Sequence, residues 1–164
     1  MRTLAVCLMA ALVLAGCVSR VGGEPEESPV STERPVELAV PIELRPVLET
    51  GSTDPAAIVL PTEDGERLAL AEPFLTIRRL DKAEITFEEN AGTWVLGLDL
   101  STADGKAFGD WTADHIGERV AMVADDEVLT APQIQDAIPG GKIQIAAQYT
   151  QDEAKALLDK ITGR

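Results

Sequence analysis

The chain has 164 residues, enough for one domain, and its 45% hydrophobic and 26% charged composition is that of a globular protein. With 28 acidic against 14 basic residues, its formal net charge of −14 argues against nucleic acid as a partner, because binding to phosphates needs excess Lys and Arg. Both cysteines lie at or before Cys17 and His115 is the only histidine, which excludes a zinc site built from His and Cys in the rest of the chain. The acidity favours solubility and a basic or neutral partner.

The N-terminus has the pattern of a secretory leader that ends at a cysteine. Arg2 precedes the apolar run Leu4–Ala15, whose twelve residues are too few for the roughly 20 of a membrane-spanning helix. The end of this run, LAGC, resembles the bacterial lipobox, in which the cysteine is diacylated and becomes the new N-terminus. A standard signal peptide with a chance cysteine is the alternative. We therefore expect a lipoprotein signal peptide at residues 1–16 and lipidation of Cys17.

The expected anchor places the protein in the cell envelope, facing outward from the cytoplasm. Two acyl chains hold a protein firmly at a membrane, whereas one chain binds only marginally. Val18 follows the cysteine, and the usual retention signal there is Asp, so we expect the outer membrane if the source has one.

Residues 17–55 are predicted to form a tether, because six of the ten prolines fall there among Gly, Ser and Glu. Within this segment the alternation VELAVPIEL predicts a strand over residues 36–48. Pro41 interrupts it, which favours an edge strand or a broken one. The folded domain is expected over residues 56–164.

The first elements of the expected domain are short strands. ERLALA (66–71) and FLTI (74–77) are candidates on either side of Glu72-Pro73. The alternating runs 83–89 and 93–100 flank Asn90-Ala91-Gly92, which predicts a hairpin.

A helix is predicted next, with Ser101 or Thr102 as its N-cap and Gly117 as its stop. One face of it carries Phe108, Trp111 and His115. Gly109 weakens the helix by about 1 kcal/mol relative to Ala, so packing must hold it.

Four short runs follow the helix. ERVAMVA (118–124) reads as a buried strand and DDEVLTA (125–131) as its return, although Asp125-Asp126 is a poor primed turn without glycine. PQIQDAI (132–138) and KIQIAA (142–147) are expected as two further runs, separated by a turn at Pro139-Gly140-Gly141.

The two glycines also raise the alternative of a phosphate-binding loop. Gly141-Lys142 is followed by Ile143, where the Walker pattern needs a hydroxyl residue. A strand rather than a helix follows, so the turn is the better interpretation.

The last helix begins at a capping box formed by Thr150 and Glu153. Its apolar stripe consists of Ala154, Leu157, Leu158 and Ile161, and Gly163 ends it. The order of strands, helix, strands and helix predicts an α+β fold, with two helices packed on one face of a small antiparallel sheet.

Residues 104–157 resemble the head subdomain of the first large periplasmic domain of SecD, a subunit of the Sec protein-export machine. The matching positions are Gly105, Phe108, Thr112, Ile116, Gly117, Asp125, Ala131, Pro132, Ile134, Gly140, Gly141, Thr150, Glu153 and Ala154. Residues 42–51 also look like the strand that precedes this head, while the family usually has Asp-Gly at Asp125-Asp126 and Gly near Ala147. SecD carries six transmembrane helices thought to use the proton gradient; this sequence has no segment long enough for one, so that energy coupling is not implied here.

The resemblance implies a binding module that contacts translocating or unfolded polypeptides. Strand addition at a sheet edge and the apolar side chains Phe74, Leu75 and Trp94 are candidates for this contact, with a core role as the alternative for each. A structural envelope lipoprotein that docks one folded partner, unrelated to export, remains the alternative function.

An enzyme is the third class and is not expected. His115 is the only imidazole and falls at a helix C-terminus, where its charge is favourable without any catalytic role. Ser101 is better explained as a cap than as a nucleophile, and nothing marks a pair of carboxylates. We expect no cofactor, no metal and no small-molecule substrate.

Overall fold

The computed structural model describes residues 30–31, 35–49 and 51–164. The expected signal peptide, the lipidation of Cys17 and the sorting residue Val18 fall outside these ranges. The strands are β1 (Val30–Ser31), β2 (Val36–Pro46), β3 (Ile58–Pro61), β4 (Arg67–Leu70), β5 (Leu75–Glu88), β6 (Thr93–Leu100), β7 (Val120–Ala124), β8 (Glu127–Thr130) and β9 (Lys142–Tyr149). The helices are α1 (Thr102–Asp114) and α2 (Gln151–Thr162).

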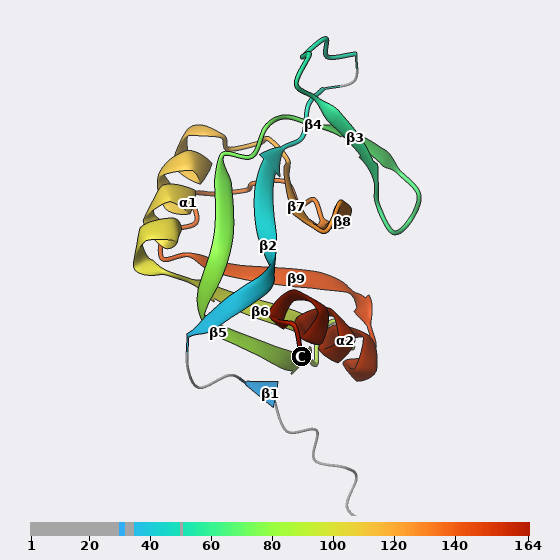
Figure 1. Ribbon diagram of the computed structural model, residues 1–164, viewed down its shortest axis with the longest axis vertical. Coiled ribbons are helices and arrows are strands. Elements are labelled where there is room, and N and C mark those ends of the chain that lie inside the picture. The colour runs from blue at the N-terminus through green and yellow to red at the C-terminus, as the bar shows by residue number, and fades with distance from the viewer. Residues whose placement is uncertain (1–29, 32–34, 50) are drawn as a thin grey trace, which may run out of the picture.

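The main sheet is antiparallel and its strands run in the order β8-β7-β2-β5-β6-β9, with β1 added beside β5 (Figure 1). β3 and β4 form a separate hairpin. The two edge strands, β8 and β9, come near each other, so the sheet curls towards itself. The architecture is thus an antiparallel sheet with two helices, as the sequence predicted at the level of fold class.

β2 lies inside the sheet, which corrects the expectation of an edge strand. Its C-terminal half pairs with β5 on one side and with β7 on the other. Pro41 is tolerated because the β2–β5 register shifts between Glu37 and Ile42, and β7 pairs only with residues 43–46. The missing N–H of Pro41 therefore interrupts no regular ladder. The strand is broken, as the proline indicated, but it is central.

β5 joins two runs that the sequence suggested as separate strands. It continues over 14 residues through a register shift between Leu80 and Lys82. At its end, Asn90-Ala91-Gly92 turns the chain into β6, with Gly92 at φ 65°, as the hairpin pattern predicted.

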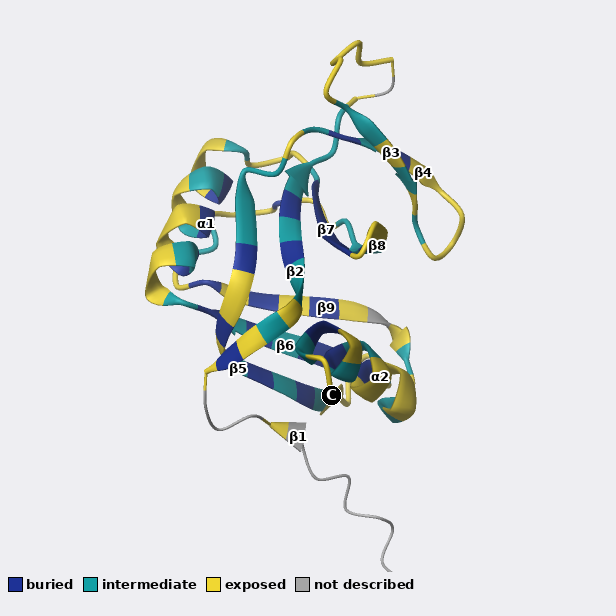
Figure 2. Cartoon of the chain, in the orientation of Figure 1, coloured by how far each residue is buried: buried dark blue, intermediate teal, exposed yellow. Residues whose placement is uncertain are grey.

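The core contains two clusters. The larger one joins sheet residues to both helices, through Phe108 of α1 and through Ala154, Leu158 and Ile161 of α2. The smaller one lies between the β3–β4 hairpin and the other side of β7, where Leu70 packs with Ala121 and Val123. β7 is consequently buried on both faces along its whole length (Figure 2).

The helix ends follow local sequence rules with one exception. Ser101 caps α1 by accepting a hydrogen bond from the Asp104 N–H, and Thr150 and Glu153 form the predicted capping box of α2. Gly163 closes α2 in the left-handed conformation. α1, however, ends at Asp114 with His115 as its C-cap, two residues before Gly117, whose N–H donates to the Ile134 carbonyl.

The segment 132–138 is a loop and not the strand that the sequence suggested. The Ile138 N–H donates to the hydroxyl of buried Thr112 on α1, at 3.0 Å, instead of to a neighbouring strand. The same loop explains Gly109, since a Cβ there would lie 3.3 Å from the Ile138 carbonyl oxygen. Close packing of α1 on this loop therefore favours a glycine in mid-helix.

The hairpin of β7 and β8 forms without a glycine. Asp125 and Asp126 have φ values of 54° and 60°, the left-handed conformation that a two-residue primed turn requires. Aspartate tolerates this region better than most residues because its short side chain hydrogen-bonds locally.

Candidate functional site

Three rings form a parallel stack at the junction of α1 and the start of β5. Phe74 and Trp111 have ring centroids 3.9 Å apart at 9°, and Trp111 and His115 have centroids 4.0 Å apart at 10°. All three side chains are only partly buried. We call these residues the aromatic stack.

Two elements position the aromatic stack. Trp111 lies in the last turn of α1 and His115 is the C-cap residue four positions later, which places the two rings on the same side of the helix end. The His115 ring nitrogen Nδ1 lies 2.7 Å from the Trp111 carbonyl oxygen, an atom that only accepts, so Nδ1 is the donor. Phe74 reaches the stack from the end of the β4–β5 connection, where its N–H donates to the Leu44 carbonyl.

The other two candidates from the sequence lie in different places. Leu75 is partly buried and packs against the larger core cluster, as Phe74 also does. Trp94 is only 5% exposed and belongs to that cluster, with Phe87 tilted against it at 5.4 Å. This burial favours the core role for Trp94, the alternative that the sequence left open. The sequence therefore identified one member of the stack among its binding candidates and placed the other two on a helix face.

A second feature is a groove of about 550 Å³ between the two edges of the sheet. Its walls come from the β3–β4 turn, from β8, from the end of β9 and from the start of α2. The lining residues are Thr62, Glu63, Asp64, Glu66, Arg119, Val128, Leu129, Thr130, Ala131, Ala146, Gln148, Tyr149 and Glu153. We call it the acidic groove, because four carboxylates and one guanidinium line it.

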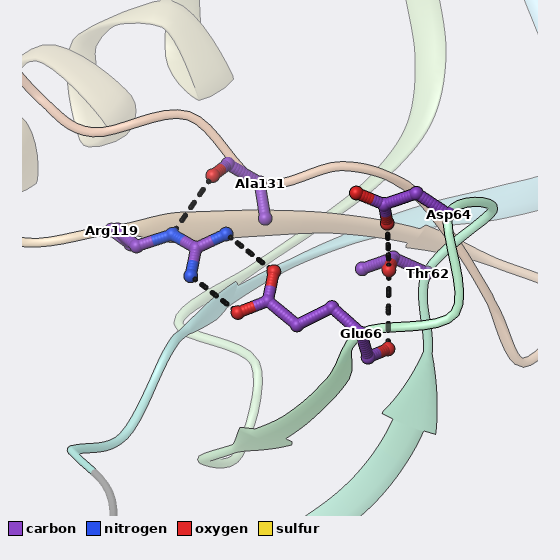
Figure 3. A network of polar contacts seen from close by, with 5 residues as sticks. All are labelled: Thr62, Asp64, Glu66, Arg119 and Ala131. Carbon is purple, nitrogen blue, oxygen red and sulfur yellow. Dashed lines mark hydrogen bonds and ion pairs between the residues drawn. The ribbon is translucent and has the colours of Figure 1, made fainter.

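Arg119 holds the β3–β4 turn against the body of the protein (Figure 3). Its guanidinium donates to both carboxylate oxygens of Glu66, at 3.2 and 3.3 Å, while its Nε donates to the Ala131 carbonyl at 3.2 Å. Within the turn, the Thr62 hydroxyl lies between the Asp64 carboxylate and the Glu66 carbonyl. Arg119, the single basic residue in the groove lining, is thus paired with Glu66.

Two of the other acids of the groove have a lowered pKa. The hydrogen bond from Thr62 lowers the pKa of Asp64, and the Thr150 N–H and hydroxyl lower the pKa of Glu153. Burial raises the pKa of Tyr149, and the carboxylates of Glu63, Glu127 and Glu153 raise it further. The groove therefore carries a negative field that a cation would relieve.

A larger groove, of about 760 Å³, runs beside α1 over Gly105, Gly109 and Pro139. It exists because these residues have small or flat side chains. Both acids and bases line it, so its charge indicates no particular partner.

The described residues carry neither a metal-ligand cluster nor a membrane-spanning helix. Over residues 30–31, 35–49 and 51–164, no three His, Cys, Asp or Glu side chains come together as metal ligands would. In the same ranges, neither helix is long and apolar enough to cross a bilayer.

Comparison with known protein families assigns the chain to one of them. The profile of the SecDF P1 head subdomain matches residues 56–161. The chain therefore belongs to the family of the SecDF P1 head subdomain.

Individual relatives agree with this assignment. The protein translocase subunit SecD of Rhodobacter capsulatus is 36% identical over 120 residues, which cover 68% of this chain and 22% of the relative. SecD of Magnetococcus marinus is 33% identical over 55% of this chain and 17% of its own length, and SecD of Mycobacterium tuberculosis 31% over 58% and 17%. The chain spans about a fifth of the length of these relatives.

Solved structures agree at the level of fold. A structure described as that of "a membrane component SecDF that enhances protein export" matches with a TM-score of 0.53 at 22% identity, covering 76% of this chain and 63% of that one. SecDF in its super-membrane-facing form matches with a TM-score of 0.51, also at 22% identity, over 74% of this chain and 18% of that one.

Sequence reasoning missed the acidic groove. Its β3–β4 turn carries Asp64-Gly65 between two apolar runs, a recognised hairpin signal. That signal predicts the turn itself, but not the approach of the turn to β8 and β9, which depends on the curl of the whole sheet.

Proposed function

We propose that this protein is a lipid-anchored binding module of the cell envelope that contacts translocating or unfolded polypeptides during protein export, without catalysis. Family membership supports the export context, since the relatives are named as subunits of a protein translocase. The lipobox-like LAGC that ends at Cys17 supports the anchor.

The aromatic stack is the observation that carries the proposal. Aromatic rings offer large, rigid apolar surfaces at a small entropic cost, and such residues dominate binding energy in protein interfaces. Phe74, Trp111 and His115 keep part of this surface accessible although each of them packs against a neighbour. An unfolded polypeptide exposes the apolar side chains that such a surface can cover.

The contact can be tested by fluorescence anisotropy with one labelled polypeptide in two states, unfolded by reduction and alkylation, and folded. We expect the protein to bind the unfolded state more tightly. Trp111→Ala should weaken this binding about fivefold or more, the effect of losing an interface residue worth at least about 1 kcal/mol.

The matched control is Phe87→Ala, which removes another exposed aromatic ring from a different part of the molecule. It should leave the affinity unchanged. If Trp111→Ala perturbs folding, as judged by circular dichroism, Phe74→Leu shortens the stack more gently. Equal binding of folded and unfolded polypeptide would contradict the proposal and would favour docking on one folded partner.

The anchor has its own test, in which Cys17→Ser is expressed beside the native sequence. We expect labelled palmitate to be incorporated into the native protein and not into the variant. Equal labelling of both would contradict lipidation at Cys17.

A further inference from the structure

The acidic groove lies where the main sheet leaves backbone groups unpaired. Over residues 35–49 and 51–164, β9 pairs with β6 alone and is the last strand of the sheet. β8 is the opposite edge, and only its Val128 is bridged, to Thr62 of the β3–β4 turn. An extended segment in the groove would therefore meet free backbone donors and acceptors along β9.

Hydrogen bonds hold two of the carboxylates at this edge. Asp64 is oriented by Thr62, and Glu153 accepts from the Thr150 N–H and hydroxyl, both at 2.8 Å. Arg119 is the one cation in the lining and is paired with Glu66. Glu63 adds a further carboxylate, so the field in the groove is negative.

This charge excludes two occupants that come from the protein itself. Residues 18–29 carry three glutamates and one arginine, so the N-terminal segment is not complementary to the groove. A second copy of the chain, with a formal net charge of −14, is repelled as a whole. A cationic partner is the one that the groove favours.

We infer that the acidic groove binds an extended polypeptide segment rich in lysine or arginine, laid along the free edge of β9. Its backbone pairs with β9, and its basic side chains lie against Glu63, Asp64 and Glu153. Tyr149, half-buried between these acids, provides a ring face for an alkyl stem or a cation. The inference rests on the proposed function and adds the charge and the conformation of the segment that is bound.

The test uses three peptides of about eight residues, the length of β9. The first alternates lysine and threonine, the second replaces lysine by glutamate, and the third is the first peptide with alternate backbone amides N-methylated. We expect the first to bind, with an affinity that falls as salt is raised, and the other two to bind at least tenfold more weakly. Equal binding of the lysine and glutamate peptides would overturn the inference, and equal binding of the N-methylated peptide would overturn the pairing with β9.

Two double variants separate the groove from the overall charge of the protein. Glu63→Gln with Asp64→Asn should weaken binding of the lysine peptide by roughly threefold to tenfold, since exposed charge pairs contribute little individually. Asp114→Asn with Asp136→Asn changes the net charge equally at exposed sites outside the groove lining. This control pair should leave the affinity unchanged; equal losses in both pairs would contradict a specific groove.

Tyr149 supplies an independent readout, because it is the only tyrosine of the chain. Its ionisation can be followed by ultraviolet absorbance, and an arginine version of the first peptide, which stays charged in the alkaline range where tyrosine ionises, should lower its pKa by offsetting nearby carboxylates. An unchanged Tyr149 titration under saturating peptide would place the peptide elsewhere and overturn the site.

The outcomes distinguish the two proposals. If Trp111→Ala weakens binding of unfolded polypeptide while the groove variants bind the lysine peptide like the native protein, the groove is excluded and the proposed function stands. If the native protein binds no unfolded polypeptide, the proposed function fails whatever the short peptides do.

Discussion

Gly140 and Gly141 are neighbours that require glycine for different reasons. Both have positive φ, 89° and 64°, so an L side chain at either position is strained. A Cβ at Gly140 would meet nothing within 4 Å, whereas one at Gly141 would lie 2.5 Å from the Cα of Gly105 on α1. Gly140 therefore shapes the turn, and Gly141 also allows the turn to contact α1.

This difference predicts unequal effects of the same substitution. Gly140→Ala should lower the free energy of unfolding by about 1 to 2 kcal/mol, the cost of a left-handed residue with a side chain. Gly141→Ala should lower the free energy of unfolding by about 1 to 3 kcal/mol more than Gly140→Ala does, because the backbone must move to admit the methyl group. Urea denaturation of the two variants measures both values. Equal losses would contradict the contact between Gly141 and Gly105.

At the scale of elements, the start of α2 links helix stability to pH. The hydrogen bonds from Thr150 lower the pKa of Glu153 in the folded protein below its ordinary value of 4.5. A lowered folded-state pKa stabilises the protein above the unfolded value, and this contribution is lost as the pH falls through the folded value. The capping box should therefore weaken only in acid.

The pH dependence can be isolated with Glu153→Gln, whose amide can still accept from the Thr150 N–H but does not titrate. The native protein should be more stable than this variant at neutral pH, and the difference should shrink as the pH falls below about 4.5. Thermal or urea unfolding over this range provides the measurement. Asp152→Asn removes another acid of the same turn outside the box and controls for charge. A difference in stability between the native protein and Glu153→Gln that does not change with pH would contradict this role of Glu153.

Elements whose ends are determined by neighbouring residues could be predicted from the sequence. The capping box and the glycine stop of α2 and the hairpin at Asn90-Ala91-Gly92 needed only neighbouring residues. The position of β2 did not follow, because the strands that flank it, β5 and β7, are chosen by tertiary packing. The aromatic stack could be predicted only in part for the same reason. Helix periodicity places Trp111 and His115 on one face, whereas the contact of Phe74 with Trp111 depends on the tertiary fold.

At the scale of the whole molecule, the fold depends on a strand that precedes the segment matched by the family profile. β2 lies at residues 36–46, between β5 and β7, while the profile begins at residue 56. Its Ile42 and Leu44 are fully buried in the larger core cluster. The segment 56–164 therefore lacks a central part of its own sheet.

This arrangement predicts that fragment 56–164 does not fold cooperatively, whereas fragment 35–164 does. Removing β2 exposes the inner edges of β5 and β7 and takes two large apolar side chains out of the core, at about 2 to 5 kcal/mol each. Circular dichroism and urea unfolding of both fragments provide the comparison. A cooperative transition of equal midpoint in fragment 56–164 would show that β2 is dispensable.

The central claim is that the aromatic stack contacts polypeptides in export, and site-specific photo-crosslinking in the source cell tests it most directly. A photoreactive residue replaces Phe74 in one strain and Val59, an exposed residue of β3 outside the stack, in a control strain. We expect position 74 to capture many different exported chains together with components of the export machinery, and position 59 to capture few. Capture of one abundant folded protein from position 74 would contradict the claim and would identify the domain as a docking piece.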